Sequence, residues 1–241
     1  MDGRPLADRV AIVTGAGRGI GRAVAEALAG QGAAVALASR TRAEIAAVAE
    51  GIRNAGGRAL AVPTDVTQDA RVEALVDQTL GQLGRVDILV TAAGVAAFGP
   101  VAGAKPNDWD PMLAVNLRAV MVCCRAVLPQ MLHQKSGTIV NVASVAAGRA
   151  IPGAAAYAAT KAGVVAWSRV LAEELRAGGV RVGAISPGAV DTSLWDTIPG
   201  GPDRARMLTP DSVARAVLLM VTLPAGATLE ELTLLPAGGI L

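Results

Sequence analysis

Residues 10–21 read VAIVTGAGRGIG, and this stretch decides the fold prediction. Residues 10–14 form a short, continuously apolar run, which is typical of a buried strand. A glycine-rich turn follows at once, and residues 20–29 then carry apolar side chains at helical spacing. Gly30 and Gly32 end that pattern. The chain therefore begins with a predicted strand, a tight turn and a helix.

The same alternation continues to the end of the chain. Six further apolar runs predict strands at 33–39, 59–62, 87–93, 138–144, 180–186 and 229–235. Between them, helical periodicity predicts helices at 41–54, 68–83, 107–133, 155–177 and 210–223. Thr41 and Glu44 have the spacing of a capping box, and Asn107 or Asp108 is expected to open the third of these helices. Seven strands that alternate with helices predict one α/β domain over residues 1–241, with a doubly wound parallel sheet.

Composition limits the class of protein. The chain has 241 residues, of which 52% are hydrophobic, and its formal net charge is +2. Such a chain can bury a large core, and its dispersed charges give no footprint for nucleic acid. The longest uncharged run, 88–104, is short for a membrane span and is broken by glycine and proline. We expect neither a nucleic acid nor a membrane partner.

The cysteines and the single histidine exclude several other classes. Cys123 and Cys124 are adjacent, so they form neither a disulfide framework nor a metal-ligand spacing. With His133 as the only histidine, no metal site is expected. The chain lacks the G-x-S-x-G and G-x-x-x-x-G-K-[ST] motifs, which argues against a serine hydrolase and a P-loop NTPase. Its first residues do not resemble a signal peptide, so we expect a cytoplasmic protein.

The glycine turn has the features of a nucleotide site. Its glycines at 15, 19 and 21 follow the pattern G-x-x-x-G-x-G. Glycine lets a ligand approach the backbone closely, and the start of a helix offers free N–H groups to a pyrophosphate. A tight strand-to-helix connection with no ligand is the alternative. The position between the first strand and the first helix favours dinucleotide binding.

The end of the second predicted strand indicates which dinucleotide is bound. An acidic residue there would accept the ribose hydroxyls of NAD(H), but this chain has Ser39 followed by Arg40. We expect no carboxylate to repel a 2′-phosphate, and Arg40 with Arg18 could pair with one. The sequence thus favours NADP(H) and leaves NAD(H) possible; a merely solvated Arg40 is the alternative. Asp65 could accept from the adenine amino group or cap its own loop.

Three polar residues suggest proton-transfer chemistry. Tyr157 is the only tyrosine, and Lys161, one of three lysines, lies one helical turn after it. A neighbouring ammonium is expected to lower the pKa of a phenol toward the physiological range, where it can exchange a proton with a substrate oxygen. Ser144 ends a predicted strand, where ligands meet open α/β sheets, and could hydrogen-bond that oxygen.

Several motifs together resemble those of the classical short-chain dehydrogenase/reductase family over nearly the whole chain: the TGAGRGIG loop, Asp65, Gly94, Asn116, Ser144, Tyr157-x-x-x-Lys161 and Pro187-Gly188. The resemblance implies a Rossmann fold with the strand order 3-2-1-4-5-6-7 and NAD(P)(H)-dependent carbonyl reduction or alcohol oxidation. It makes Tyr157 the proton donor or acceptor, and Lys161 the residue that holds the nicotinamide ribose. It also makes Ser144 the group that orients the substrate oxygen, and Asn116 the support of a relay water.

The glycine motif, the strand ends and the resemblance together define the expected cofactor site. The residues expected to bind the cofactor are Gly15, Gly17, Arg18, Gly19, Ile20, Gly21, Ser39, Arg40, Asp65, Val66, Ala93, Gly94, Tyr157, Lys161, Pro187, Gly188, Val190 and Thr192. The chain departs from the family at Thr91-Ala92-Ala93-Gly94, where the family often has N-N-A-G. Hydrogen bonds in that part of the sheet are expected to come from Thr91, the backbone or water.

Substrate specificity is expected in the loops 95–101, 145–156 and 189–208, of which the last is a candidate lid. They contain Phe98, Ile151 and Trp195, so we expect a carbonyl or alcohol substrate with an apolar flank. Arg149, Arg204 or Arg206 could meet an acidic group, although solvated loop charges are the simpler interpretation. A 3-oxoacyl thioester and a general ketone both remain open as substrates.

The sequence leaves two other functions open, and it predicts an assembly. The alternatives are a catalytically silent NAD(P)-binding regulator on the same fold and a sugar-nucleotide epimerase. The intact Ser144, Tyr157 and Lys161 set argues against the regulator, and the absence of an extra C-terminal substrate region argues against the epimerase. The predicted helices 107–133 and 155–177 are apolar on more than one face, so we expect a homodimer or homotetramer through them.

Overall fold

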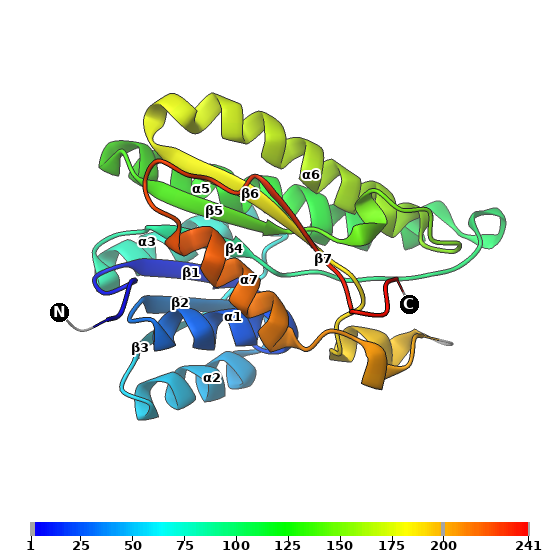
Figure 1. Cartoon of the computed structure of the whole chain (residues 1–241), viewed down its shortest axis with the longest axis horizontal. Helices are drawn as coiled ribbons and strands as arrows, with labels where there is room; N and C mark the ends of the chain where they lie inside the picture. The colour runs from blue at the N-terminus through cyan, green and yellow to red at the C-terminus, as the bar shows by residue number, and fades with distance from the viewer. Residues whose placement is uncertain (1–2, 199–200, 241) are drawn as a thin grey trace.

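A seven-stranded sheet forms the centre of the molecule in the computed structural model, which describes residues 3–198 and 201–240. The strand order is β3-β2-β1-β4-β5-β6-β7, and every neighbouring pair is parallel (Figure 1). The strands are β1 Val10–Thr14, β2 Ala34–Ser39, β3 Arg58–Pro63, β4 Ile88–Thr91, β5 Gly137–Val142, β6 Val180–Pro187 and β7 Glu231–Leu234. The predicted fold class, strand number and strand order are confirmed.

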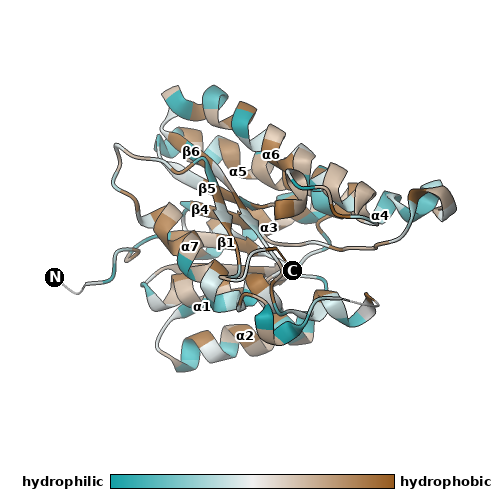
Figure 2. Cartoon of the chain, turned by 45° about the vertical axis from the view of Figure 1, so that its right-hand side comes forward, coloured by the Kyte–Doolittle hydropathy of each residue, from teal (hydrophilic) through white to brown (hydrophobic). Residues whose placement is uncertain are grey.

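Helices cover both faces of this sheet (Figure 1). One face packs against α1 Gly19–Gly30, α2 Arg42–Asn54 and α7 Pro210–Thr222. The other packs against α3 Asp69–Leu83, α5 Ala119–Gln134 and α6 Ala155–Leu175. Successive strand residues point to opposite faces, so Val13 of β1 joins the first layer of core and Ile12 joins the second. Figure 2 shows the hydrophilic residues along the outer turns of α2 and α6.

The stretch predicted as one helix over 107–133 has several parts. A 3-10 turn over Pro106–Asp108 precedes a single α-turn, α4 Asp110–Met112, and a π-helical segment, Leu113–Arg118, leads into α5. The predicted start at Asn107 or Asp108 is therefore wrong. Pro111 lies in the first turn of α4, where its missing N–H costs no hydrogen bond. A π-segment needs an extra residue per turn and often marks a functional site.

Among the described residues, this same stretch is the one helix that is long and apolar enough to span a membrane. Residues Pro106–Gln134 are long and apolar enough to cross a membrane by length and composition. The core helix of an α/β domain passes the same test. Val120, Cys124 and Val127 of α5 are buried in the core layer that faces β4 and β5, so their apolar character serves this packing.

Smaller corrections concern the ends of elements. The capping box on α2 is wrong, because Thr41 is the N-cap residue but its side chain makes no capping hydrogen bond. Strand β5 ends at Val142, so Ser144 lies two residues beyond the strand rather than at its end. Strand β4 is likewise limited to Ile88–Thr91, and α6 ends at Leu175 before a 3-10 turn. In β4 and β5 the apolar pattern thus continues beyond the last residue of the strand.

Candidate active site

The carboxyl ends of the strands open into a cavity of about 670 Å³. This volume lies in the range of small-molecule and cofactor sites, and the position is the one at which open α/β sheets bind ligands. Every residue predicted from sequence to bind the cofactor lines this cavity. Of the four predicted catalytic residues, Ser144, Tyr157 and Lys161 line it, and Asn116 does not.

The glycine turn forms a close-packed floor for one end of the cavity. Gly15 has a φ of +67°, and a Cβ there would lie 2.8 Å from the carbonyl oxygen of Ala92. A Cβ on Gly21 would lie 2.3 Å from the carbonyl oxygen of Gly15. No side chain fits at either position, so the backbone itself faces the cavity at the start of α1. This arrangement fits a pyrophosphate, which binds N–H groups at a helix N-terminus.

Charged side chains from the glycine turn and from the ends of β2 and β3 also border the cavity. Arg18 and Arg40 are exposed and line the cavity. Asp65 accepts hydrogen bonds from the backbone N–H and the hydroxyl of Thr67, at 3.0 and 2.7 Å. These bonds lower the pKa of Asp65, and the Arg40 guanidinium lowers it further. Asp65 therefore does cap its loop, while it also borders the cavity.

Glu44 is a cavity residue that the sequence analysis missed. A Cβ built on Gly17 would lie 2.6 Å from Glu44 Oε2 and 3.2 Å from Ser39 Oγ, and Glu44 lines the cavity. A carboxylate therefore lies close to Ser39 at the end of β2, although no acidic residue directly follows that strand in the sequence. The first turn of α2 folds back over the glycine turn and brings Glu44 there. Linear spacing gives no sign of this contact, since Glu44 follows the end of β2 by five residues.

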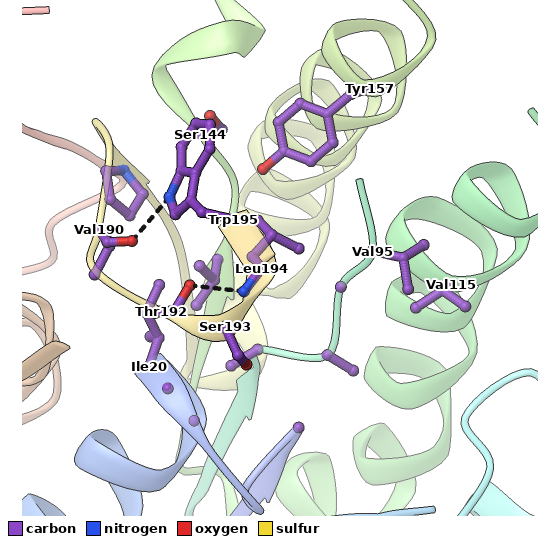
Figure 3. Close-up of a pocket in the computed structure, with 18 of the residues that line it drawn as sticks. Ile20, Val95, Val115, Ser144, Tyr157, Val190, Thr192, Ser193, Leu194 and Trp195 are labelled. Carbon is purple, nitrogen blue, oxygen red and sulfur yellow. Dashed lines mark hydrogen bonds between the residues drawn. The ribbon is translucent and has the colours of Figure 1, made fainter. Parts of the chain in front are cut away.

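The three polar residues meet at the other end of the cavity. Tyr157 lies in the first turn of α6 and is half-buried, and Ser144 follows β5. Figure 3 shows the Tyr157 hydroxyl pointing toward Ser144 and Trp195. Lys161 is buried one turn along α6, and its Nζ lies 5.8 Å from the centroid of the Tyr157 ring. That Nζ donates a 2.8 Å hydrogen bond to the carbonyl oxygen of Val142.

The electrostatics of this cluster differ from the sequence-based expectation. Burial raises the pKa of Tyr157 above its usual value, and a hydrogen bond with the Ser144 side chain lowers it by less. Burial also lowers the pKa of Lys161 to about 8. The predicted lowering of the Tyr157 pKa by Lys161 is therefore wrong for the protein in this state. Desolvation disfavours both charged forms, and it is the largest influence on the pKa of each group.

Asn116 lies in the π-segment and fixes the loop after β4. Its Oδ1 accepts from the backbone N–H of Val95, and its Nδ2 donates to the carbonyl oxygen of Val95, both at 2.8 Å. Its Nδ2 also lies 3.3 Å from Thr160 Oγ1 on α6. The amide thus joins the β4 loop, the π-segment and α6 directly behind the cavity wall.

The departure at Thr91-Ala92-Ala93-Gly94 is compensated by other side chains. Thr14 Oγ1 accepts from the backbone N–H groups of Ala92 and Ala93, at 3.1 and 3.3 Å. The Thr91 hydroxyl donates to Asn141 Oδ1 at 2.7 Å. Thr91 was expected to contribute, but the larger share falls to Thr14 at the end of β1, directly before the glycine turn.

Aromatic side chains close the cavity above Tyr157. Phe98 lies edge-on to Tyr157, with ring centroids 5.7 Å apart, and its centroid is 6.0 Å from that of Trp195. Trp195 belongs to a 3-10 turn, Ser193–Thr197, and its Nε1 donates to the carbonyl oxygen of Val190 at 3.0 Å (Figure 3). These contacts link the β4 loop to the segment after β6. Residues 199 and 200 of the third predicted substrate loop lie outside the described residues.

The remaining lining residues are mostly apolar, and some had no sequence signal. Val95 and Val115 (Figure 3) line this end, as do Ile151, Leu194, Ile198 and Ile240. Val115 comes from the π-segment and Ile240 from the C-terminal segment, and neither position follows from strand spacing. Arg149, Arg204 and Arg206 do not line the cavity. Arg204 instead pairs with Asp191 and Asp196 beside it.

Comparison with known proteins agrees with this geometry. The short chain dehydrogenase family matches residues 9–201. The chain belongs to this family. A 3-oxoacyl-[acyl-carrier-protein] reductase of Synechocystis sp. (strain ATCC 27184 / PCC 6803 / Kazusa) is 39% identical to this short-chain dehydrogenase, and the alignment covers 98% of each chain.

Two solved structures extend the comparison. A metagenomic short-chain oxidoreductase in complex with NADP has a TM-score of 0.85 and 36% identity, and the match covers 97% of this chain and 99% of that chain. An alcohol dehydrogenase from the archaeon Thermococcus sibiricus, complexed with 5-hydroxy-NADP, has a TM-score of 0.88 and 32% identity, with 95% and 97% covered. This short-chain dehydrogenase is thus an oxidoreductase with a nicotinamide cofactor site.

Proposed function

We propose that this enzyme transfers a hydride between NADP(H) and the carbonyl or secondary alcohol carbon of a small substrate with an apolar flank. Tyr157 is the general acid and base. The observation that carries this proposal is the meeting of Tyr157, Ser144 and Lys161 at a cavity whose other end is the glycine turn. One cavity thus joins a dinucleotide cradle to a proton donor.

The residues of this chain fit the cofactor at both ends. The glycine turn suits the pyrophosphate, and Arg18 and Arg40 are cations for a 2′-phosphate. Pro187, Gly188, Val190 and Thr192 line the same cavity, and we assign them to the nicotinamide. When bound, the cofactor supplies or accepts the hydride. The NADP complex of the metagenomic relative supports the choice of NADP(H).

Tyr157 donates and accepts the proton of the reaction, and its neighbours position the substrate oxygen and the cofactor. Because the pKa of Tyr157 is raised by burial, its hydroxyl holds a proton at neutral pH and donates it to the substrate oxygen during reduction. The Ser144 hydroxyl donates to the same oxygen and orients it. The ammonium group of Lys161 has three N–H donors. One of them donates to the carbonyl oxygen of Val142, and the other two would donate to the hydroxyls of the nicotinamide ribose. In oxidation the proton returns to Tyr157.

The substrate end of the cavity favours an uncharged, apolar group. Its lining includes Phe98, Ile151, Leu194 and Trp195. The three loop arginines named in the sequence analysis do not line it. We propose that the loops 95–101, 145–156 and 189–208 select the substrate. The 3-oxoacyl-[acyl-carrier-protein] reductase of Synechocystis supports a 3-oxoacyl thioester; a simple ketone satisfies the same lining.

Exchanging Tyr157 for Phe tests the assignment. The variant should lose turnover about 10²- to 10⁴-fold, because a positioned general acid contributes about that much, with little change in NADPH affinity. Turnover is measured by NADPH and NADH absorbance with a panel of 3-oxoacyl thioesters and ketones, and affinity by calorimetry. Wild-type turnover in the variant would refute the role of Tyr157. A wild-type protein that binds NADPH but reduces no carbonyl would favour the silent regulator.

A further inference from the structure

The charged side chains at the β2 end of the cavity are balanced. Arg18 and Arg40 bring two positive charges, and Glu44 and Asp65 bring two negative charges; all four line the cavity. The sequence directs attention to the two arginines, because no acidic residue stands at the end of β2. The structure adds carboxylates from two other segments. The choice between NADP(H) and NAD(H) therefore depends on how each carboxylate is placed.

Asp65 acts on Arg40. Its pKa is lowered first by the hydrogen bonds from Thr67 and then by the Arg40 guanidinium, so the two charges lie close enough to interact. Asp65 therefore adds a negative charge near Arg40. Asp65 itself is held in its loop by Thr67.

Glu44 acts on the space above Gly17. Its Oε2 and Ser39 Oγ both lie close to the point that a Cβ of Gly17 would occupy, at 2.6 and 3.2 Å. This point lies between the glycine turn and the end of β2, where a dinucleotide fold places the adenosine ribose. A carboxylate there accepts a hydrogen bond from a ribose hydroxyl. It repels a 2′-phosphate, which carries a charge of about −1.5 to −2 at neutral pH.

We propose that Glu44 is a specificity-determining residue that weakens NADP(H) binding and supports NAD(H) binding, so that the enzyme uses both cofactors. This inference rests on the proposed function of the same site. Arg18 and Arg40 attract the 2′-phosphate, and Glu44 opposes them. Removing the Glu44 charge should therefore increase the preference for NADP(H) over NAD(H).

The test compares Glu44→Gln with a matched control, Glu50→Gln. Glu50 lies on the same helix, is exposed and does not line the cavity. Calorimetry gives the Kd of NADPH, NADH, adenosine 2′,5′-bisphosphate and AMP for each protein. Glu44→Gln should bind NADPH and the bisphosphate about three- to tenfold more tightly, with NADH and AMP unchanged or weaker. The gain should shrink at high salt, because ions screen a partly exposed carboxylate. Glu50→Gln should match the wild type.

Other outcomes overturn the inference in distinguishable ways. An unchanged ratio of the NADPH and NADH dissociation constants would mean that Glu44 does not sense the 2′-position. An equal change for both cofactors, with a lower Tm, would mean a structural role in the first turn of α2. Failure of the wild type to bind either dinucleotide would instead refute the proposed function itself.

Discussion

Lys161 is a buried cation whose burial has a measurable cost. Its side chain is 4% exposed, and burial lowers its pKa from 10.5 to about 8. Its one described hydrogen bond goes to a neutral carbonyl group on β5. A cation held in this way is easily deprotonated, so the pKa of Lys161 is set by the fold and by what it binds.

Exchanging Lys161 for Met should make this cost visible as a pH dependence of stability. Between pH 8 and pH 10.5 the unfolded chain keeps the Lys161 proton and the folded chain loses it. The free energy of unfolding of the wild type relative to the variant should therefore rise with pH in this window, by up to about 3 kcal/mol. Below pH 8 the difference should be constant. Urea unfolding from pH 7 to pH 10 measures it, and a flat difference throughout would contradict the lowered pKa.

Single residues differ in how well the sequence predicts their roles. Ser144, Tyr157 and Lys161 could be predicted because tyrosine and lysine are rare in this chain and their spacing sets them on one helix face. Glu44 could not, because its role depends on how α2 lies over the glycine turn. The direction of the shift in the Tyr157 pKa also could not be predicted, because a sequence shows which residues are neighbours along the chain but not which are buried.

At the scale of elements, Thr14 joins the end of β1 to the loop after β4. It is buried, and its hydroxyl oxygen accepts from two backbone N–H groups. The glycine turn begins at the next residue. These two hydrogen bonds therefore hold the glycine turn and the loop after β4 together, and both belong to the cofactor site. The sequence shows the loss of the family's two amides here, but it does not show which side chain replaces them.

Replacing Thr14 by Val, which has a similar shape, should destabilise the protein by about 1–3 kcal/mol, because two buried N–H groups lose their partner. Thr14→Ser keeps the hydroxyl and should lose less. Guanidinium unfolding of the three proteins measures the change. NADPH affinity should fall in the Val variant and hold in the Ser variant. Equal stability of the Val and Ser variants would show that the hydroxyl does not matter.

Strands and helices were predicted more reliably than the transitions between them. Apolar runs identify the central strands because buried parallel strands are continuously apolar, as in β1, β4 and β5. The π-segment Leu113–Arg118 was missed, because its turns are set by contacts such as those of Asn116 with the β4 loop. Strand ends were overestimated where apolar residues continue past the last pairing.

At the scale of the whole molecule, each of the two helices predicted to join subunits carries an exposed apolar residue. Leu132 of α5 is 41% exposed and Val170 of α6 is 59% exposed. Exposed apolar patches often mark contacts between proteins. The parallel sheet and its layers follow from the alternation along the chain, but the alternation cannot say which outer helix face meets another copy.

We predict a dimer or tetramer through α5 and α6. Sedimentation velocity at micromolar concentration should show it for the wild type, and Val170→Glu should shift the distribution toward smaller species, since a buried unpaired charge is costly. Val101→Glu is a matched control, because Val101 is also exposed but lies in the loop after β4. A wild type that sediments as a monomer would refute this assembly.

The C-terminal segment has a practical consequence for handling the protein. Ile240 lines the cavity, and Figure 1 shows the segment before β1 and the C-terminal segment on opposite sides of the molecule. A purification tag fused to the C-terminal segment would follow closely on Ile240, which lines the cavity, and would compete with a ligand for that space. A tag placed ahead of β1 would hang from the far side, so kinetic work should use that end.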